Sequence, residues 1–451
     1  MTAQTLNNKH YLIIGLGLTG LSCARFCKKH DLSFELCDTR SDLPGLEAIR
    51  QEFPGIAIRL GDLTVDFLAG FDELLVSPGI STRTALFREA AVRGVRISGD
   101  IQLFSEYAQK PVVAITGSNG KSTVTTLVNE LINASGKRAV AGGNLGTPAL
   151  DLLSASGVDV YVVELSSFQL ETTTDLGAEA AVILNISPDH MDRYDGMADY
   201  EDAKQRIFQS VNQTLINRDD DHTRPTDPRV VVSSTFGLSE PQAGQFGIAD
   251  IDGEQWLMKG DEPLVKSADL RIRGSHNVAN ALAALALVDL LGIDIYRCLT
   301  ALVNFPGLAH RCQWVSTIRG VDYFNDSKGT NVGSTVAAVK GLSAQLKGRI
   351  WLLAGGEGKG QDFTELADIC SASPVAEVLT YGADRAKIAA DISSQVATSD
   401  WLALEDALAD ASARAQAGDI ILLSPACASF DQFRNYVHRG EFFCQCVEEL
   451  Q

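Results

Sequence analysis

The sequence is short of long apolar runs, paired cysteines and positive charge. No stretch approaches ~18 consecutive apolar residues, so we expect no membrane-spanning helix. The polar first ten residues contain no charged region followed by a long apolar run, so we expect no signal peptide. The nine cysteines are scattered and form no C-x-x-C, which argues against a zinc site or disulfide framework and favours reduced thiols in the cytoplasm. Because 57 acidic residues outnumber 38 basic ones, the formal net charge is −19, and we expect no nucleic-acid partner held by bulk attraction.

What remains is the composition of an ordinary globular chain. With 451 residues, 45% of them hydrophobic, the chain is too apolar for disorder and long enough for about three domains. We place these domains at residues 1–99, 100–307 and 308–451. Apolar runs rich in Val, Ile and Leu alternate with glycine turns and helical stretches, which is typical of parallel strands covered on both faces. We therefore predict an α/β fold, with a β-rich excursion at residues 222–274. The predicted strands are 10–14, 33–37, 112–116, 158–165, 180–186, 349–354, 375–381 and 419–424, and the clearest helices are 18–29 and 276–291.

A glycine motif of the form G-x-G-x-x-G occupies residues 15–20, between the first predicted strand and helix. Its glycines permit a tight turn and let a phosphate approach the helix N-terminus. Asp38 ends the next strand, where a carboxylate binds ribose hydroxyls in dinucleotide folds. NAD or FAD, another nucleotide, and a purely structural turn all fit this motif. Arg40 lies beside Asp38, and a simple NAD site has no need of it.

A second nucleotide motif, G-S-N-G-K-S-T, follows the predicted strand 112–116. Backbone N–H groups of such a loop cradle phosphate oxygens, a lysine neutralises their charge, and a hydroxyl reaches Mg²⁺. The loop is a variant, because Ile115 stands where the usual spacing has glycine. Two nucleotide-type sites favour an ATP-dependent enzyme whose other substrate also carries a nucleotide. The loop supplies the predicted phosphate-binding and metal-binding residues Gly117, Ser118, Asn119, Gly120, Lys121, Ser122 and Thr123.

Further polar groups end other predicted strands, the edge where parallel sheets bind ligands. Glu164 is placed to hold Mg²⁺ beside the phosphate loop. Asp189, His190 and Asp192 gather after the next strand. Lys204, judged by spacing alone, is an ordinary surface lysine. Later polar segments are the asparagines at 277 and 280, the turn 325–331, the glycine loop 355–360 and the loop 424–431, whose Ser429 could simply cap the last helix.

Taken together, these motifs resemble the Mur ligase family nearly end to end. The strings that carry the resemblance are G-S-N-G-K-S-T, G-G-N-L-G, E-L-S-S-F-Q-L-E, D-H-M-D-R-Y, H-N-V-A-N, N-D-S-K-G-T-N and S-P-A-C-A-S. Two of them, E-L-S-S-F-Q-L-E and S-P-A-C-A-S, favour the D-glutamate-adding member. The resemblance implies a Rossmann-like N-terminal domain for the UDP part of a substrate, a central P-loop-type ATPase domain with a mostly parallel sheet, and a Rossmann-like C-terminal domain for the amino acid.

The implied reaction joins D-glutamate to UDP-N-acetylmuramoyl-L-alanine with ATP and two Mg²⁺ ions, in cytoplasmic peptidoglycan synthesis by a monomer without a membrane partner. The catalytic residues implied are Lys121, Glu164, His190 and Lys204, the last carbamylated and a ligand of the second ion with His190. Glu164 with Ser122 or Thr123 would hold the first ion. Further implied residues are Asn277, Asn280, Arg311 and Asp326 for ATP, Leu18, Thr19, Asp38, Thr39, Arg40, Ser77, Pro78, Gly79, Asn144 and Ser166 for the UDP substrate, and Lys328, Thr330, Lys359, Ser429 and Tyr436 for D-glutamate.

Three alternatives stay open at this point. Folylpolyglutamate synthetase also joins glutamate through an acyl phosphate, although the residues at 38–40 speak against it. A nicotinamide-dependent oxidoreductase would use the first glycine motif. A nucleotide-binding regulator would bind without catalysis.

Overall fold

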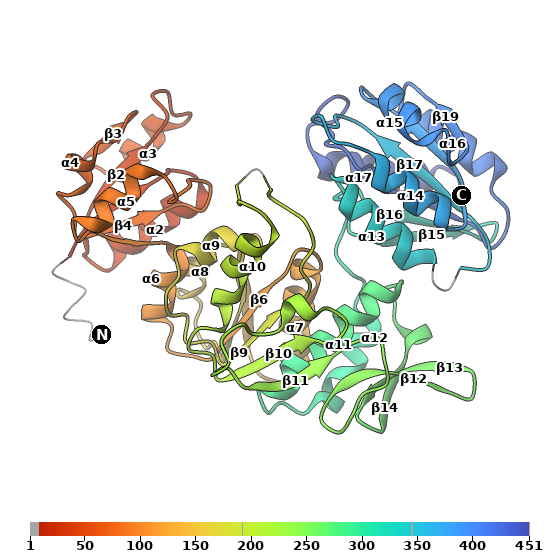
Figure 1. Ribbon diagram of the computed structural model, residues 1–451, viewed down its shortest axis with the longest axis horizontal. Helices are drawn as coiled ribbons and strands as arrows, with labels where there is room; N and C mark the ends of the chain where they lie inside the picture. The colour runs from red at the N-terminus through yellow and green to blue at the C-terminus, as the bar shows by residue number, and fades with distance from the viewer. Residues whose placement is uncertain (1–8, 192, 344–345, 451) are drawn as a thin grey trace. The chain divides into compact units, whose positions relative to one another are not determined.

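The computed structural model describes residues 9–191, 193–343 and 346–450 (Figure 1). Contacts within the chain group them into two compact units. The first comprises residues up to 236 together with 244–246 and 283–298. The second comprises 237–243, 247–282 and 299–451. In the described part of the chain, no helix is long and apolar enough to cross a membrane.

The first unit begins with a five-stranded parallel sheet in the order β3-β2-β1-β4-β5. Continuous apolar sequence forms its centre because both faces are covered: Tyr11 to Ile14 of β1 are fully buried. The strands are β1 (His10–Ile14), β2 (Ser33–Asp38), β3 (Ile58–Leu60), β4 (Glu73–Val76) and β5 (Arg96–Ser98). The helices are α2 (Leu18–Lys29), α3 (Leu46–Glu52), α4 (Val65–Leu68), α5 (Ala85–Val92) and α6 (Asp100–Tyr107).

A second sheet of the first unit carries six parallel strands in the order β11-β10-β9-β6-β8-β7. They are β6 (Val112–Thr116), β7 (Ala139–Gly143), β8 (Val160–Glu164), β9 (Ala180–Ile183), β10 (Gln213–Asn217) and β11 (Val232–Phe236), and β11 pairs with Phe246. The helical segments are α7 (Lys121–Ala134), α8 (Ala149–Leu152), α9 (Ser167–Glu171), α10 (Met197–Gln205), η1 (Arg206–Phe208), η2 (Asp221–Thr223) and η4 (Ile295–Cys298). Since β6 lies between β8 and β9, the loops after these three strands meet at one edge.

The second unit contains a six-stranded sheet in the order β15-β16-β20-β17-β18-β19, parallel except for the β15–β16 pair. Its strands are β15 (Gln313–Ile318), β16 (Val321–Asn325), β17 (Ile350–Gly355), β18 (Val375–Tyr381), β19 (Thr398–Asp400) and β20 (Ile420–Leu423). Its helices are α12 (Leu299–Asn304), α13 (Val332–Ser343), α14 (Thr364–Ala372), α15 (Arg385–Ile392), α16 (Leu404–Arg414) and α17 (Tyr436–Glu448). The predicted β-rich excursion is present: β12 (Phe246–Ile251) and the antiparallel hairpin of β13 (Glu254–Lys259) and β14 (Glu262–Lys266) follow β11, and η3 (Ser267–Asp269) precedes α11 (Ser275–Leu290).

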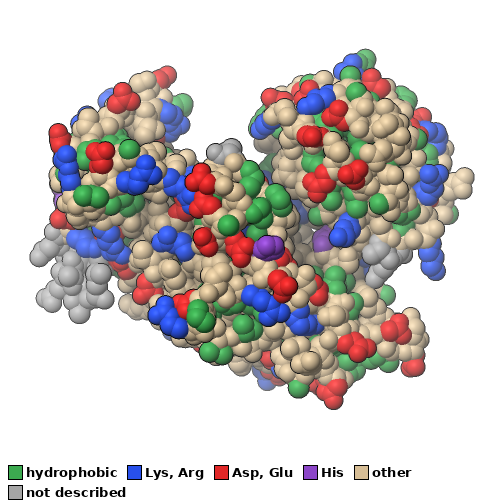
Figure 2. Space-filling model, viewed as in Figure 1, with side chains coloured by type: hydrophobic (Ala, Val, Ile, Leu, Met, Phe, Trp, Pro, Cys, Tyr) green, Lys and Arg blue, Asp and Glu red, His purple; other side chains and the backbone are tan. Residues whose placement is uncertain are grey.

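Acidic and basic side chains are interspersed over the visible surface of both units (Figure 2). An anionic substrate therefore has to be recognised by local groups, which directs attention to the strand-end loops.

Candidate active site

The phosphate loop connects β6 to α7, as predicted. Ile115, the residue that departs from the usual spacing, is a fully buried part of β6. The loop turns at Gly117 and Gly120, which have φ angles of 153° and 81°, outside the range that other residues readily adopt. Helix α7 then begins at Lys121. This is the strand–loop–helix geometry that presents backbone N–H groups to a phosphate.

Neighbouring polar groups hold this loop in shape. Nζ of Lys121 donates to the carbonyl oxygens of Gly117 and Ser118 at 2.8 and 2.9 Å. The backbone N–H of Asn119 donates to Oδ1 of Asn185 at 2.8 Å, and Nδ2 of Asn185 returns a bond to the carbonyl of Asn119. Sequence reasoning did not assign Asn185 a role, although its place at a strand end was a usable signal.

Glu164 ends β8, where its side chain is 2% exposed. Nδ2 of Asn144 donates to its Oε1 at 2.6 Å. Its other oxygen, Oε2, is buried without a hydrogen-bond partner in the described structure. A buried carboxylate oxygen with open lone pairs is costly unless a cation or donor meets it. The predicted metal ligand therefore offers an oxygen that a divalent cation fits.

Lys204 is 1% exposed, so the surface lysine suggested by spacing alone is wrong. Its Nζ donates to the carbonyl oxygen of Gly117 at 2.9 Å and lies 4.7 Å from the ring centroid of Tyr200. Burial lowers the pKa of Lys204 well below its ordinary value, and the charge of Lys121 lowers it further, whereas Asp189 and Glu164 act in the opposite direction. The helical pattern of α10 was visible in the sequence, but the face that points inward was not.

His190 lies beside the same cluster. Its ring is 4.7 Å from that of Phe168 and 6.5 Å from that of Tyr200, with Nε2 3.6 Å from the Asp189 carboxylate. The hydroxyl of Tyr200 is 3.2 Å from Oγ of Ser118. Tyr200 therefore connects the phosphate loop with Lys204 and His190. Asp192, which the sequence groups with His190, lies outside the described residues.

These groups make an unusual donor set for metal. Within the described residues no three His, Cys, Asp or Glu side chains converge in a metal-binding arrangement. The predicted set instead combines hydroxyls, one glutamate, one histidine and a lysine. Ser122 and Thr123 are buried at the start of α7. Oxygen donors of this kind suit Mg²⁺, which keeps several of its own waters.

A cavity of about 470 Å³ adjoins the first glycine motif. Asp38 is enclosed there: its oxygens accept from the guanidinium of Arg40 at 2.8 Å and from the N–H of Leu16 at 2.8 Å. These bonds, above all those from Arg40, lower the pKa of Asp38 to about 2. The cavity brings together nine of the ten residues predicted for the UDP substrate. They are Leu18, Thr19, Asp38, Thr39, Arg40, Ser77, Pro78, Gly79 and Asn144. The tenth, Ser166, caps α9 in a capping box with Gln169, which itself lines the cavity.

The second unit collects the remaining predicted residues. Asp326 is buried and accepts from the N–H of Cys312 at 3.0 Å and from the Ser424 hydroxyl at 2.7 Å. Burial raises its pKa to about 7. Arg311 precedes Cys312 directly. On α11, Nδ2 of Asn280 donates to Oδ1 of Asn277 at 3.2 Å, so the two asparagines lie on one face of the helix.

Four of the residues predicted for D-glutamate come from loops after β16, β17 and β20, which are neighbours in the sheet, and the fifth, Tyr436, begins α17. Nζ of Lys328 lies 4.0 Å from the ring centroid of Tyr436, and the N–H of Thr330 donates to the carbonyl of Lys328. An isolated bridge between Glu357 and Ala428 joins the loop that carries Lys359 to the one that carries Ser429. Ser429 does not cap α17, because Asn435 does so by accepting from the N–H of His438.

Sequence reasoning missed the residue that ties these loops together. Arg439 of α17 is fully buried. Its guanidinium donates to Oγ and the carbonyl of Ser327 at 2.9 and 2.8 Å and to the carbonyl of Cys427 at 3.1 Å. No pattern in the sequence separates this arginine from exposed ones on other helices.

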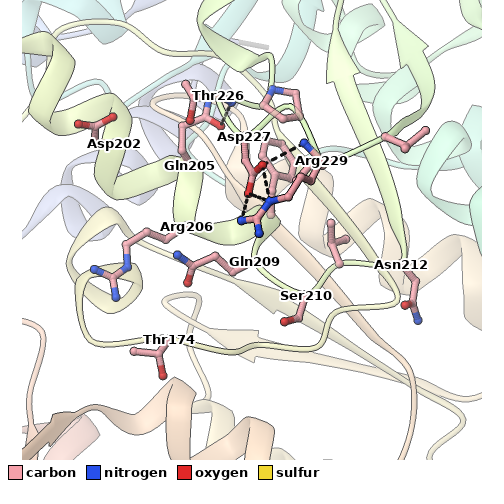
Figure 3. A pocket seen from close by; sticks show the side chains of 15 residues that line it. Thr174, Asp202, Gln205, Arg206, Gln209, Ser210, Asn212, Thr226, Asp227 and Arg229 are labelled. Atoms are coloured by element: carbon pink, nitrogen blue, oxygen red, sulfur yellow. Dashed lines mark hydrogen bonds and ion pairs between the residues drawn. The ribbon is translucent and has the colours of Figure 1, made fainter.

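A separate cavity of about 920 Å³ lies in the first unit (Figure 3). Asp202, Gln205 and Arg206, which flank Lys204 in sequence, line it together with Asp227 and Arg229, which pair with each other. It contains none of the predicted site residues. Lys204 contacts the phosphate loop instead. Residues 202–206 therefore face the cavity on one side and the phosphate loop on the other.

Comparison with known proteins identifies the family. Three family models match in order: the Mur ligase MurD-like N-terminal domain at 9–99, the Mur ligase middle domain at 115–288, and the Mur ligase glutamate ligase domain at 310–427. A UDP-N-acetylmuramoylalanine–D-glutamate ligase of Pseudomonas fluorescens is 50% identical over 97% of this chain and 98% of its own. The chain belongs to the Mur ligase family. Enzymes of the same name from Pseudomonas aeruginosa and Methylobacillus flagellatus are 49% and 48% identical, over 97% and 99% of this chain and 98% of each relative.

Solved structures agree on the fold of this Mur ligase. MurF from Acinetobacter baumannii superposes with a TM-score of 0.62 at 16% identity, covering 99% of this chain and 92% of that one. The UDP-N-acetylmuramate-alanine ligase of Thermotoga maritima does so with a TM-score of 0.58 at 18% identity, covering 98% and 100%. The family resemblance and the three-domain α/β fold expected from the sequence are thus confirmed.

Proposed function

We propose that this Mur ligase adds D-glutamate to UDP-N-acetylmuramoyl-L-alanine at the expense of ATP, in peptidoglycan precursor synthesis. The observation that carries the proposal is the position of Asn144. It lines the cavity beside the first glycine motif and donates to Glu164 next to the phosphate loop. A nucleotide-linked substrate in that cavity therefore has a route for its far end toward the phosphate loop. The near-full-length similarity to D-glutamate ligases supplies the choice of amino acid.

The proposed chemistry has two steps. A carboxylate reacts poorly with an amine, because oxide would have to leave. The L-alanine carboxylate of the substrate therefore attacks the γ-phosphorus of ATP, and ADP departs. The amine of D-glutamate then attacks the acyl phosphate, and inorganic phosphate leaves the tetrahedral intermediate. Positioning and charge neutralisation supply most of the acceleration. Lys121 and the loop N–H groups are the natural partners of the phosphates.

Mg²⁺ would neutralise charge on the transferred phosphoryl group. Glu164, with its open Oε2, and Ser122 or Thr123 would hold one ion. His190 and Lys204 would hold a second. For Lys204 to do so, we propose that its Nζ adds to the carbon of CO₂ with loss of a proton, which gives a carbamate. Burial of this amine beside Lys121 favours the neutral, nucleophilic form.

The second unit would supply the other partners. We assign Asn277, Asn280, Arg311 and Asp326 to ATP. The loops tied by Arg439 would receive D-glutamate, with Lys328 and Lys359 facing its carboxylates and Thr330, Ser429 and Tyr436 completing the site. We expect the enzyme to act as a monomer in the cytoplasm.

Phosphate release from ATP tests the proposal. Purified protein is given UDP-N-acetylmuramoyl-L-alanine with D-glutamate, L-glutamate, meso-diaminopimelate or L-lysine. We expect release with D-glutamate alone and a product heavier by one glutamyl residue. Lys121→Ala should abolish ADP formation, whereas Lys137→Ala, which removes an exposed lysine, should not. Release with another amino acid would change the member of the family, and no release with any would contradict the proposal.

A further inference from the structure

Arg193 lies between the two nucleotide-type sites of the first unit. Its Nη1 donates to the carbonyl oxygen of Pro78 at 3.0 Å, and Pro78 lines the cavity of the first glycine motif. Its Nη2 donates to Oε2 of Glu171, the last residue of α9, at 2.7 Å. The guanidinium lies 4.0 Å from the ring centroid of Phe168, and the Phe168 ring also contacts the rings of His190 and Tyr194. One side chain thus touches the cavity wall, α9 and the packing of His190.

The contacts of Arg193 lie mostly away from solvent. Arg193 and Glu171 are 12% and 7% exposed, so their ion pair is largely removed from solvent. Oε1 of Glu171 accepts from Nε of a second arginine, Arg83, at 3.0 Å, and Arg83 also pairs with Asp199. Arg83 does not have the other contacts of Arg193: its partners in the described structure do not include Pro78 or Phe168. The two arginines therefore share one carboxylate but differ in what else they hold.

The loop that Arg193 holds is itself part of the cavity frame. Oγ of Ser77 donates to the carbonyl of Gly15 at 2.7 Å, which joins the 77–79 loop to the glycine motif. Arg193 anchors the next residue of that loop to α9. A planar guanidinium presents donors in several fixed directions and can stack on an aromatic ring, whereas a lysine offers a compact ammonium on a flexible stem.

We propose that Arg193 is a positioning residue that holds the substrate-binding loop 77–79 in a fixed position relative to α9 and His190. Without it, the loop would occupy its binding position only part of the time, and the apparent dissociation constant rises as the inverse of that fraction. A displaced substrate would also reach the phosphate loop in poor geometry, where a shift of about 1 Å can cost about 100-fold in rate. The proposal rests on the proposed function for the identity of the substrate.

The test compares Arg193→Ala with Arg193→Lys and with Arg83→Ala as the matched control. Binding of UDP-N-acetylmuramoyl-L-alanine and of a non-hydrolysable ATP analogue is measured by calorimetry, beside kcat, KM and Tm. For Arg193→Ala we expect the dissociation constant of the UDP substrate to rise about 10-fold or more and kcat to fall at least as far. Affinity for the ATP analogue should stay within about 2-fold. Arg193→Lys should lie between, since lysine keeps the charge but lacks the planar fork that contacts Pro78 and Glu171 while stacking on Phe168.

Arg83→Ala removes an ion pair from the same glutamate and should lower Tm comparably, with UDP-substrate affinity and kcat within about 3-fold of wild type. Equal effects of Arg83→Ala and Arg193→Ala on substrate affinity would overturn the proposal. The proposal would also be overturned if Arg193→Ala lowered Tm but left the affinity for the UDP substrate unchanged relative to that for the ATP analogue, because that result marks a merely structural role. Wild-type protein that fails to bind the UDP substrate would instead contradict the proposed function. An active wild type with an unaffected Arg193→Ala variant would contradict this inference alone.

Discussion

Lys121 and Lys204 donate to the same carbonyl oxygen, that of Gly117, at 2.8 and 2.9 Å. Two ammonium groups on one acceptor repel each other, and Lys204, which is the more buried, carries the larger penalty. A lysine in the last turn of α10 is thereby kept at the phosphate loop in a state that favours loss of its proton. That is an unsuitable place for a structural salt bridge and a suitable one for a reactive amine.

If Lys204 acts as a carbamate, a small carboxylate should replace part of its function. We expect Lys204→Ala to lose about 100-fold or more in kcat, the scale of removing one charged group from a reaction centre. Added formate or acetate should restore a measurable fraction, because the cavity left by the side chain admits an anion where the carbamate stood. The measurement is the rate of ADP formation against carboxylate concentration.

Sodium chloride at equal ionic strength serves as the control for that rescue, and Lys137→Ala should show neither the loss nor the gain. Full activity of Lys204→Ala without additive would contradict the carbamate. So would a rate of ADP formation that rises as much with chloride as with acetate.

The first glycine motif offers a matched pair of substitutions. A Cβ at Gly20 would lie within 2 Å of the carbonyl oxygen of Gly15, whereas one at Gly17 meets nothing within 4 Å. Gly20→Ala should therefore lower the free energy of unfolding by about 2–3 kcal/mol, the cost of overpacking. Gly17→Ala should leave it nearly unchanged and instead weaken binding of the UDP substrate, since this glycine lines the cavity. Thermal unfolding measures the stability of both variants, and calorimetric titration measures their affinity for the UDP substrate. Equal destabilisation by Gly20→Ala and Gly17→Ala would contradict the different roles given to the two glycines.

The fold could be predicted from sequence because its signals are local. The strands His10–Ile14 and Val112–Thr116 fall where continuous apolar runs end in glycine turns, and the helix Leu18–Lys29 follows at once. The first glycine motif and the phosphate loop lie at those turns, so both were visible in the sequence. The full set of residues assigned to the UDP substrate came from the family resemblance, and their role stays a prediction. Boundaries shifted by one to three residues elsewhere, as for β9, which ends at Ile183 because the following residues turn toward the phosphate loop.

Long-range relationships could not be predicted in this way. Lys204 shows an ordinary helical spacing, and only the packing of α10 against the loop buries it. Arg439 bonds to Ser327, 112 residues away, and Arg193 to Pro78, 115 residues away. Such contacts depend on which helix face the tertiary structure covers, and a single sequence does not encode that in any periodic pattern.

Asp326 should make the stability of the second unit depend on pH. Its pKa is raised from 3.8 to about 7, so between these values the folded protein holds a proton that the unfolded chain has lost. Stability contributed by that proton is present below about pH 4 and is lost as pH rises toward 7, by up to about 1.4 kcal/mol per pH unit. Asp326→Asn removes this pH-dependent contribution to stability, because asparagine does not titrate. The Tm of the variant relative to wild type should therefore increase from pH 4.5 to pH 7.5, and a difference that is flat or falls over this range would contradict the burial effect.

Arg439 should matter for stability more than any exposed arginine of the same region. Arg439→Met keeps the volume but leaves the carbonyl oxygens of Ser327 and Cys427 buried without their donors, at about 1–3 kcal/mol for each unsatisfied group. Arg434 is exposed and serves as the control. Arg434→Met should change the free energy of unfolding by less than about 0.5 kcal/mol. Because Arg439 joins the loops on either side of the predicted D-glutamate site, its loss should also raise KM for D-glutamate while leaving affinity for the UDP substrate unchanged. Denaturant unfolding and steady-state kinetics measure both effects. A variant that unfolds like wild type, or that alters UDP-substrate affinity instead, would show that the loops are held by other contacts.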